Sequence, residues 1–145
     1  MRRSEDKRPL TAAGRAANST DPQTWTTYDE AVRSTAGAGV GFVLNGDGVA
    51  CIDLDHSVRP DGSLEPWAEA IVQAAGPTFV EVSVSGTGLH IFGYASVRQG
   101  RRIRRDGMSV EVYGTGRFIA VTGRRFADAP AVLADISELV ADLMA

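Results

Sequence analysis

Residues 40–55 read VGFVLNGDGVACIDLD and place two apolar runs on either side of a short polar turn. The turn contains Asn45-Gly46 and Asp47-Gly48, dipeptides that supply the positive φ values required in tight hairpin turns. Residues 40–44 and 49–55 are therefore predicted to pair as a β-hairpin.

Two further pairs of apolar runs follow the same pattern. Residues 79–84 and 89–94 flank SGTG at 85–88, and residues 109–113 and 118–122 flank GTG at 114–116. Three consecutive hairpins predict a mainly antiparallel sheet.

Helices are expected between and after these strands. Thr27 and Glu30 have the spacing of a capping box, which predicts a short helix before Gly37. Pro66 suits the first position of a helix over residues 66–75, which Gly76 ends. Pro130 is expected to open a C-terminal helix packed on the sheet, with the apolar stripe Val132, Leu133, Ile136, Leu139, Val140 and Leu143. The predicted fold class is α+β.

Length and composition indicate one globular domain. The chain has 145 residues, of which 43% are hydrophobic and 23% charged. It has no apolar run near the ~18 residues of a membrane span, and no apolar segment follows the basic first residues as in a secretory signal. The lone Cys51 excludes an internal disulfide, so a cytoplasmic protein is expected. Residues 1–20 are expected to form an extended or poorly ordered arm, and residues 21–145 a single domain.

The basic charge is concentrated in one place. The net charge of −3 argues against a phosphate-binding surface on average, but Lys7 is the only lysine among the 15 basic residues, and five arginines lie within residues 98–105. Arginine's planar fork matches phosphate oxygens, so this strip is compatible with nucleic acid. A solvated loop without a partner remains the alternative.

Asp53 and Asp55 are separated by one residue at the end of an apolar run. Side chains alternate along a strand, so both carboxylates are expected on one face, where a divalent cation would relieve their repulsion. Oxygen ligands favour Mg²⁺ or Mn²⁺ over zinc. An EF-hand is excluded, because Val58 or Pro60 occupies the place of its required glycine. A solvated pair of acids remains the alternative.

Two more segments carry candidate chemistry. The turn SGTGLH at residues 85–90 offers two glycines, a hydroxyl and the imidazole of His90, a plausible cradle for a triphosphate. Glu111 interrupts the apolar run VEVY at 110–113. If its strand lies next to the strand of Asp53 and Asp55, Glu111 would add a third carboxylate to that pair. A plain glycine turn and a solvent-facing Glu are the structural alternatives.

Taken in order, DLDH at 53–56, SGTGLH at 85–90, and VEVY at 110–113 followed by GRF at 116–118 and TG at 122–123 resemble the archaeo-eukaryotic primase superfamily. The similarity is to its bifunctional primase-polymerase branch, found in phages, plasmids and integrated elements. It covers about residues 7–125.

The resemblance implies an RRM-like antiparallel sheet with flanking helices and template-directed nucleotidyl transfer on single-stranded DNA. Asp53, Asp55 and Glu111 would be catalytic and would hold two Mg²⁺ or Mn²⁺ ions. The dNTP or NTP would be bound by Ser85, Gly86, Gly88, His90 and Arg117. Candidates for contacts to DNA phosphates are Arg101, Arg102, Arg104 and Arg105.

Family members usually carry a further strand and helix before residues 7–9, and many continue into a helicase or a primase-associated helical domain. A separate protein that provides such a domain is therefore a candidate partner. The other functions left open are a non-catalytic replication or nucleic-acid-binding module with the same fold and, further away, a metal-dependent phosphodiesterase.

Overall fold

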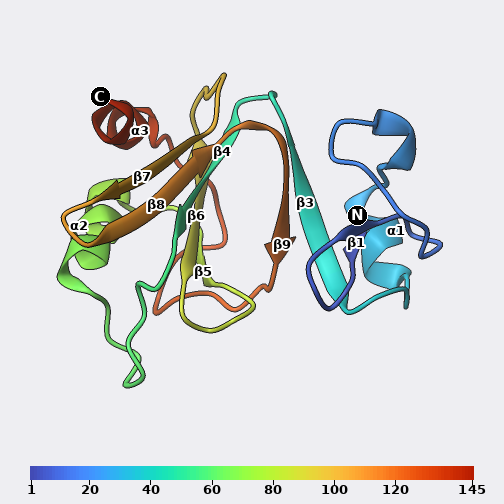
Figure 1. Cartoon of the computed structure of the whole chain (residues 1–145), viewed down its shortest axis with the longest axis horizontal. Coiled ribbons are helices and arrows are strands. Elements are labelled where there is room, and N and C mark those ends of the chain that lie inside the picture. Colours follow the sequence, from blue (N-terminus) through green and yellow to red (C-terminus); the bar gives the residue numbers. More distant parts are fainter. The chain divides into compact units, whose positions relative to one another are not determined.

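The computed structural model describes residues 1–145, which form two compact units (Figure 1). The first unit comprises Met1–Asn45 and Gly116–Thr122, and the second Gly46–Thr115 and Gly123–Ala145. Both units are built on antiparallel strands with few helices, which confirms the predicted α+β class. A single domain over residues 21–145 stays a prediction.

The first unit is a four-stranded sheet in the order β2-β1-β3-β9. Its elements are β1 (Arg2–Arg3), β2 (Pro9–Leu10), the 3-10 helix η1 (Pro22–Thr24), α1 (Tyr28–Arg33), β3 (Gly39–Asn45) and β9 (Thr115–Val121). The arm expected over residues 1–20 therefore contributes two short strands. The helix predicted from the capping box is confirmed, since the Thr27 hydroxyl accepts the N–H of Glu30 at 3.3 Å.

The second unit contains the five-stranded sheet β5-β6-β4-β8-β7, in which every neighbouring pair is antiparallel. Its elements are β4 (Val49–Leu54), α2 (Pro66–Ala75), β5 (Val80–Val82), β6 (Leu89–Tyr94), β7 (Arg101–Arg105), β8 (Met108–Tyr113) and α3 (Ser137–Met144). The helix predicted over residues 66–75 is confirmed.

One face of this sheet forms the hydrophobic core with α2 and α3, which Figure 1 shows on the same side of the strands. Ile52, Leu54 and Val112 are fully buried there against Ile71 of α2 and Leu139 of α3. Complete burial of such a side chain is worth roughly 1.5–3 kcal/mol. The apolar residues of β4 thus anchor the strand and turn its alternate side chains to the opposite face.

Two of the three predicted hairpins are wrong. β3 pairs with β1 and β9 in the first sheet, while β4 pairs with β6 and β8 in the second. The pair expected over 109–113 and 118–122 is likewise split between β8 and β9. The reason is that β4 is the central strand of its sheet, so both of its edges are already occupied. The middle pair, β5 with β6, is confirmed.

The C-terminal helix begins later than predicted, at Ser137 instead of Pro130. Residues before it run beside the end of β6, where the N–H of Tyr94 donates to the carbonyl of Ala134 at 2.8 Å and the N–H of Ile136 donates to the carbonyl of Tyr94 at 3.0 Å. These backbone pairs hold the segment extended. The longest helix, α2, has ten residues, and no helix has the length and apolar character of a membrane span.

Candidate active site

Five polar residues form a straight row across the second sheet, one from each strand. Asp53 on the central strand is paired in register with His90 on one side and with Glu111 on the other. His90 is paired in turn with Glu81, and Glu111 with Arg102. Directly paired residues point to the same face, so this row lies opposite the face that packs on the helices.

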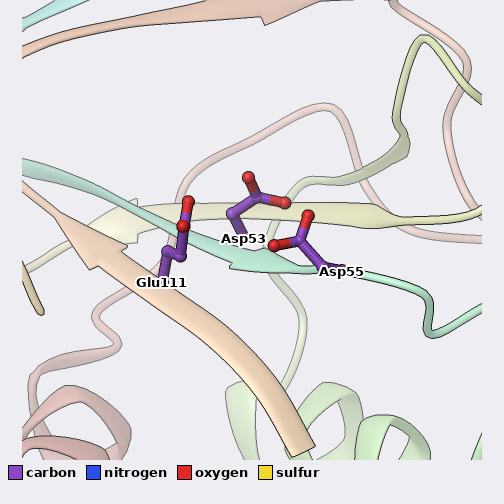
Figure 2. A group of neighbouring side chains, drawn as sticks. All are labelled: Asp53, Asp55 and Glu111. Atoms are coloured by element: carbon purple, nitrogen blue, oxygen red, sulfur yellow. The ribbon is translucent and has the colours of Figure 1, made fainter. Parts of the chain in front are cut away.

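The three predicted carboxylates meet on this face. Asp53, Asp55 and Glu111 each offer an oxygen, and these atoms all lie within 4.8 Å of one another (Figure 2). Alternation along β4 brings the two aspartates together, and the N–H of Asp55 donates to the carbonyl of Ser109 on β8 at 2.9 Å. Figure 2 shows all three side chains extending to one side of β4 and β8.

This donor set fits a divalent metal ion. It consists only of carboxylate oxygens, the ligands that Mg²⁺ and Mn²⁺ prefer, and Glu111 is largely buried. Three negative charges this close repel one another unless cations lie nearby. The site is therefore chemically suited to the ions that the sequence predicted.

Cationic side chains border the cluster. Arg102 Nε lies 2.8 Å from Glu111 Oε1, and Arg104 Nη2 lies 4.0 Å from the same oxygen. A hydrogen bond with Tyr113 and the charge of Glu111 raise the pKa of Arg102 above its ordinary value, so this guanidinium remains charged. His90 Nε2 lies 3.9 Å from Asp53 Oδ1. The acidic cluster is thus flanked by positive or protonatable groups on both sides.

The strip of arginines forms a strand, β7, which the sequence did not predict. Its side chains alternate: Arg102 and Arg104 share the face of the acidic cluster, whereas Ile103 enters the core on the other face. Arg101 belongs to that other face and donates to the Met144 carbonyl at the end of α3. Alternation along β7 puts Arg105 on the same face as Arg101. The four candidate DNA contacts are therefore divided between two faces of the sheet.

The turn that precedes His90 presents hydroxyl groups. Ser85 Oγ lies 3.2 Å from Ser83 Oγ and 2.9 Å from Thr87 Oγ1. The backbone N–H groups of Gly86, Thr87 and Gly88 donate within the turn, to the Ser83 carbonyl, Ser85 Oγ and Ser83 Oγ. These three amides are therefore used within the turn, and triphosphate binding by the turn stays a prediction.

Gly88 is required for close packing in this turn. A Cβ atom there would lie 2.9 Å from the carbonyl oxygen of Leu54, between the two aspartates of β4. The turn and the acidic strand end are thus packed against each other. The remaining candidate, Arg117, lies on β9 in the first unit, and its role in the site stays a prediction.

Glu81 is the polar residue of the row that sequence reasoning missed. Its Oε2 lies 2.9 Å from His90 Nδ1, and its Oε1 accepts the N–H of Gly123 at 3.0 Å. The same signal that singled out Glu111 was available here, because Glu81 also interrupts an apolar strand, between Val80 and Val82. With only one apolar residue of β5 on either side, however, the pattern around Glu81 is weaker than that around Glu111.

Cys51 lies on the same face of β4 but is fully buried. Burial raises the pKa of its thiol well above the ordinary value, and the negative charges of Asp53, Glu81 and Glu111 raise it further. The thiol therefore stays protonated and contributes packing only.

The fold and this site together define a class: an α+β protein with a candidate divalent-metal centre on the face of an antiparallel sheet that lies opposite its helices. The family model described as "Bifunctional DNA primase/polymerase, N-terminal" matches residues 2–138, which is most of the chain. The chain belongs to this family, as its three ordered motifs suggested.

A curated relative supports the assignment. The chain is similar to a "DNA Primase-polymerase" of Nitratiruptor phage NrS-1, with 35% identity over 122 residues. The match covers 78% of this chain and 17% of the phage protein, so the chain spans less than a fifth of that relative's length.

Proposed function

We propose that this chain is the catalytic domain of a DNA primase/polymerase, a nucleotidyltransferase that extends a strand on a single-stranded DNA template. The observation that carries the proposal is the convergence of Asp53, Asp55 and Glu111 within 4.8 Å on the sheet face opposite the helices. Membership of the primase/polymerase family supports this chemistry over other metal-dependent reactions.

The three carboxylates would hold two Mg²⁺ or Mn²⁺ ions. When bound, such ions supply activation of a 3′-hydroxyl and stabilisation of the charge that develops at the α-phosphate and the departing pyrophosphate. The chain's own contribution is rigid placement of the ligands: Asp53 and Glu111 are fixed by direct pairing between β4 and β8, and Asp55 by its backbone hydrogen bond to Ser109. Fixed ligands hold the reacting groups in line without further rearrangement.

The nucleotide triphosphate would lie beside the turn that ends in His90. The Ser85 hydroxyl and the His90 imidazole can both donate to phosphate oxygens. Gly86 supplies the positive φ of the turn, and Gly88 keeps its backbone close to the end of β4. Arg117 is retained as a further phosphate ligand on the strength of the family motif alone.

DNA would contact the arginines of β7. Arg102 and Arg104 share the face of the acidic cluster, where the reacting 3′ end must lie, so they are the preferred phosphate contacts. Arg101 and Arg105 belong to the opposite face and would contact DNA only outside the reaction centre. A separate helicase or primase-associated domain remains a candidate partner.

One observation favours a non-catalytic alternative. The Arg102 guanidinium already pairs with Glu111 at 2.8 Å, so part of the acidic cluster is neutralised by the protein itself. In a nucleic-acid-binding module of the same fold, this ion pair would be permanent, and DNA binding would need neither metal nor nucleotide.

Incorporation of labelled dNTP or NTP on primed single-stranded DNA, with Mn²⁺ or Mg²⁺ supplied, tests the proposal. Asp53→Asn is expected to reduce incorporation by about a thousandfold, because loss of a metal ligand removes several kcal/mol of transition-state stabilisation. Asp47→Asn is the matched control, since Asp47 is exposed and its loss changes the net charge equally.

Calorimetry separates the two functions. The catalytic proposal expects triphosphate binding only when a divalent ion is present. Asp53→Asn should abolish this metal-dependent binding. A wild-type protein that binds DNA but neither binds nor incorporates nucleotides would establish the non-catalytic module. Shortening of the DNA substrate in place of extension would indicate a phosphodiesterase.

A further inference from the structure

The carboxylate of Glu81 is completely buried, yet it belongs to a short strand with Val80 and Val82 on either side. An ionised carboxylate in such surroundings is costly unless its oxygens receive hydrogen bonds. Both oxygens are used: Oε2 lies 2.9 Å from His90 Nδ1, and Oε1 accepts the N–H of Gly123 at 3.0 Å.

The second of these bonds depends on a chain segment that covers the outer edge of β5. The N–H of Val82 donates to the carbonyl of Arg124, and the N–H of Phe126 donates to the carbonyl of Val80, both at 2.8 Å. This backbone pairing fixes the N–H of Gly123 beside Glu81. The glutamate is therefore held in place before any ligand binds.

We propose that Glu81 is a positioning residue, which fixes the imidazole of His90 so that Nε2 faces the metal and nucleotide site. The inference rests on the proposed function, because it takes His90 as the ligand of a phosphate. A phosphate oxygen can only accept a hydrogen bond, so the ring that binds it carries a proton on Nε2 in addition to the proton on Nδ1 that faces Glu81. Glu81 lies outside the three motifs DLDH, SGTGLH and VEVY that resemble the family.

The contacts of the His90 imidazole restrict both its orientation and the position of its proton. An ionised carboxylate can only accept hydrogen bonds, so its contact with Nδ1 requires the proton on that nitrogen. The edge of the imidazole packs against Phe92, with ring centroids 6.1 Å apart at an interplanar angle of 82°. Nε2 then lies 3.9 Å from Asp53 Oδ1, at the border of the acidic cluster. The orienting carboxylate, the ring and the candidate metal ligand thus form one line across β5, β6 and β4.

A glutamine cannot replace Glu81 in this role, although it has the same shape. Its amide has one oxygen and one NH₂ group, whereas both oxygens of Glu81 accept hydrogen bonds. The N–H of Gly123 cannot change its role and so captures the amide oxygen. The NH₂ group then faces Nδ1, which must give up its proton and become an acceptor. Glu81→Gln should therefore move the ring proton to Nε2.

Nitrogen-15 NMR of the imidazole rings measures this directly, and the chain has only two histidines, His56 and His90. In the wild-type protein, His90 is expected to carry a proton on Nδ1. In Glu81→Gln, recorded at a pH where the ring is neutral, the proton should be found on Nε2. His56, which is exposed, serves as the internal control and should not change.

Steady-state kinetics provide the functional comparison. In the variant the NH₂ group that faces Nδ1 excludes a second ring proton, so the phosphate loses its charge-assisted hydrogen bond. The KM for the nucleotide should therefore rise about tenfold, the lower range for residues that orient a ligand. The kcat should remain within about threefold, because the carboxylates of the acidic cluster are unchanged. A purely structural role would lower kcat with the folded fraction and leave KM alone. Glu138→Gln, an exposed change of equal charge on α3, is the matched control.

An unprotonated Nδ1 on wild-type His90 would overturn the inference, and this measurement decides even if Glu81→Gln fails to fold. An unaltered tautomer or an unaltered KM in a folded variant would also overturn it. The proposed function fails separately: a wild-type protein that incorporates no nucleotide would refute it whatever the tautomer of His90. Normal incorporation with an unaltered tautomer would refute only the role of Glu81.

Discussion

Arg102 Nε lies 2.8 Å from Oε1 of Glu111, the residue directly opposite it on the neighbouring strand. The Arg102 side chain is 66% exposed, whereas that of Glu111 is 12% exposed. The pair therefore joins an exposed surface cation to a carboxylate that also belongs to the candidate metal centre. A bound metal ion and the guanidinium would compete for the same oxygen.

Arg102→Gln is accordingly expected to strengthen Mn²⁺ binding. Removal of a positive charge beside the ligands relieves repulsion of the ion, and the exposure of Arg102 limits the effect to about threefold in Kd. Electron paramagnetic resonance of free Mn²⁺ gives the affinity. Arg105→Gln removes the same charge from the other face and should have a smaller effect. Unchanged or weaker Mn²⁺ binding by Arg102→Gln would contradict this electrostatic argument.

The division of the arginines between two faces makes a prediction about DNA. Arg104→Gln should weaken binding of single-stranded DNA more than Arg105→Gln, because Arg104 shares the face of the acidic cluster. If Arg104 contacts one phosphate, the slope of log K against log salt should fall by about 0.7. Fluorescence anisotropy at several salt concentrations measures both quantities. Equal losses for the two variants would mean that the faces do not determine where DNA binds.

Cys51 should be inert in the folded protein. It is fully buried in the middle of the sheet, and its thiol stays protonated, so a thiol reagent has neither access nor a thiolate to attack. Ellman's reagent should detect no thiol under native conditions and one per chain in concentrated guanidinium chloride. Rapid labelling under native conditions would contradict this prediction, because it would show that reagents reach β4. Protection by nucleotide would then show that they reach it from the side of the acidic cluster.

The start of α3 should respond to acid. The Asp135 carboxylate accepts the N–H of Ser137 at 2.8 Å, and hydrogen bonds from the hydroxyl and N–H of Ser137 lower the pKa of Asp135 below its ordinary value. A carboxyl with a lower pKa in the folded state stabilises the protein above the unfolded pKa, near 3.8, and loses that contribution as the pH falls through the folded pKa.

Comparison of Asp135→Ala with the wild type isolates this contribution. Urea unfolding should show the variant to be less stable at neutral pH, with a difference that shrinks as the pH falls below about 4. Asp142→Ala, an exposed change of equal charge within α3, is the matched control. A difference independent of pH would indicate that Asp135 acts through its shape and not its charge.

The local patterns of the sequence predicted those features that depend on neighbours along the chain. The helix over residues 66–75 and the cap at Thr27 were predicted correctly, because proline, glycine and capping residues act within one turn. The clustering of Asp53 with Asp55 also follows from strand alternation alone. Glu111 was placed with them by the order of the motifs, and the register of β4 with β8 brings it there.

Strand partners could not be predicted in the same way. A turn such as Asn45-Gly46 reverses the chain but does not determine whether the strands that it connects pair with each other. β4 pairs with β6 and β8 because its apolar side faces α2 and α3, a choice that depends on distant parts of the sequence. The role of Glu81 was missed for the same reason, since its contact with His90 exists only in the paired strands.

The alternation of polar and apolar side chains along β4 also limits how this family can vary during evolution. A substitution at one position alters either the chemistry of one face or the packing of the other. Insertion or deletion of one residue within the strand would instead exchange the two sets, burying the aspartates against the helices and exposing the apolar residues. Such length changes should be selected against in β4, while single substitutions on its polar face remain open to adaptation.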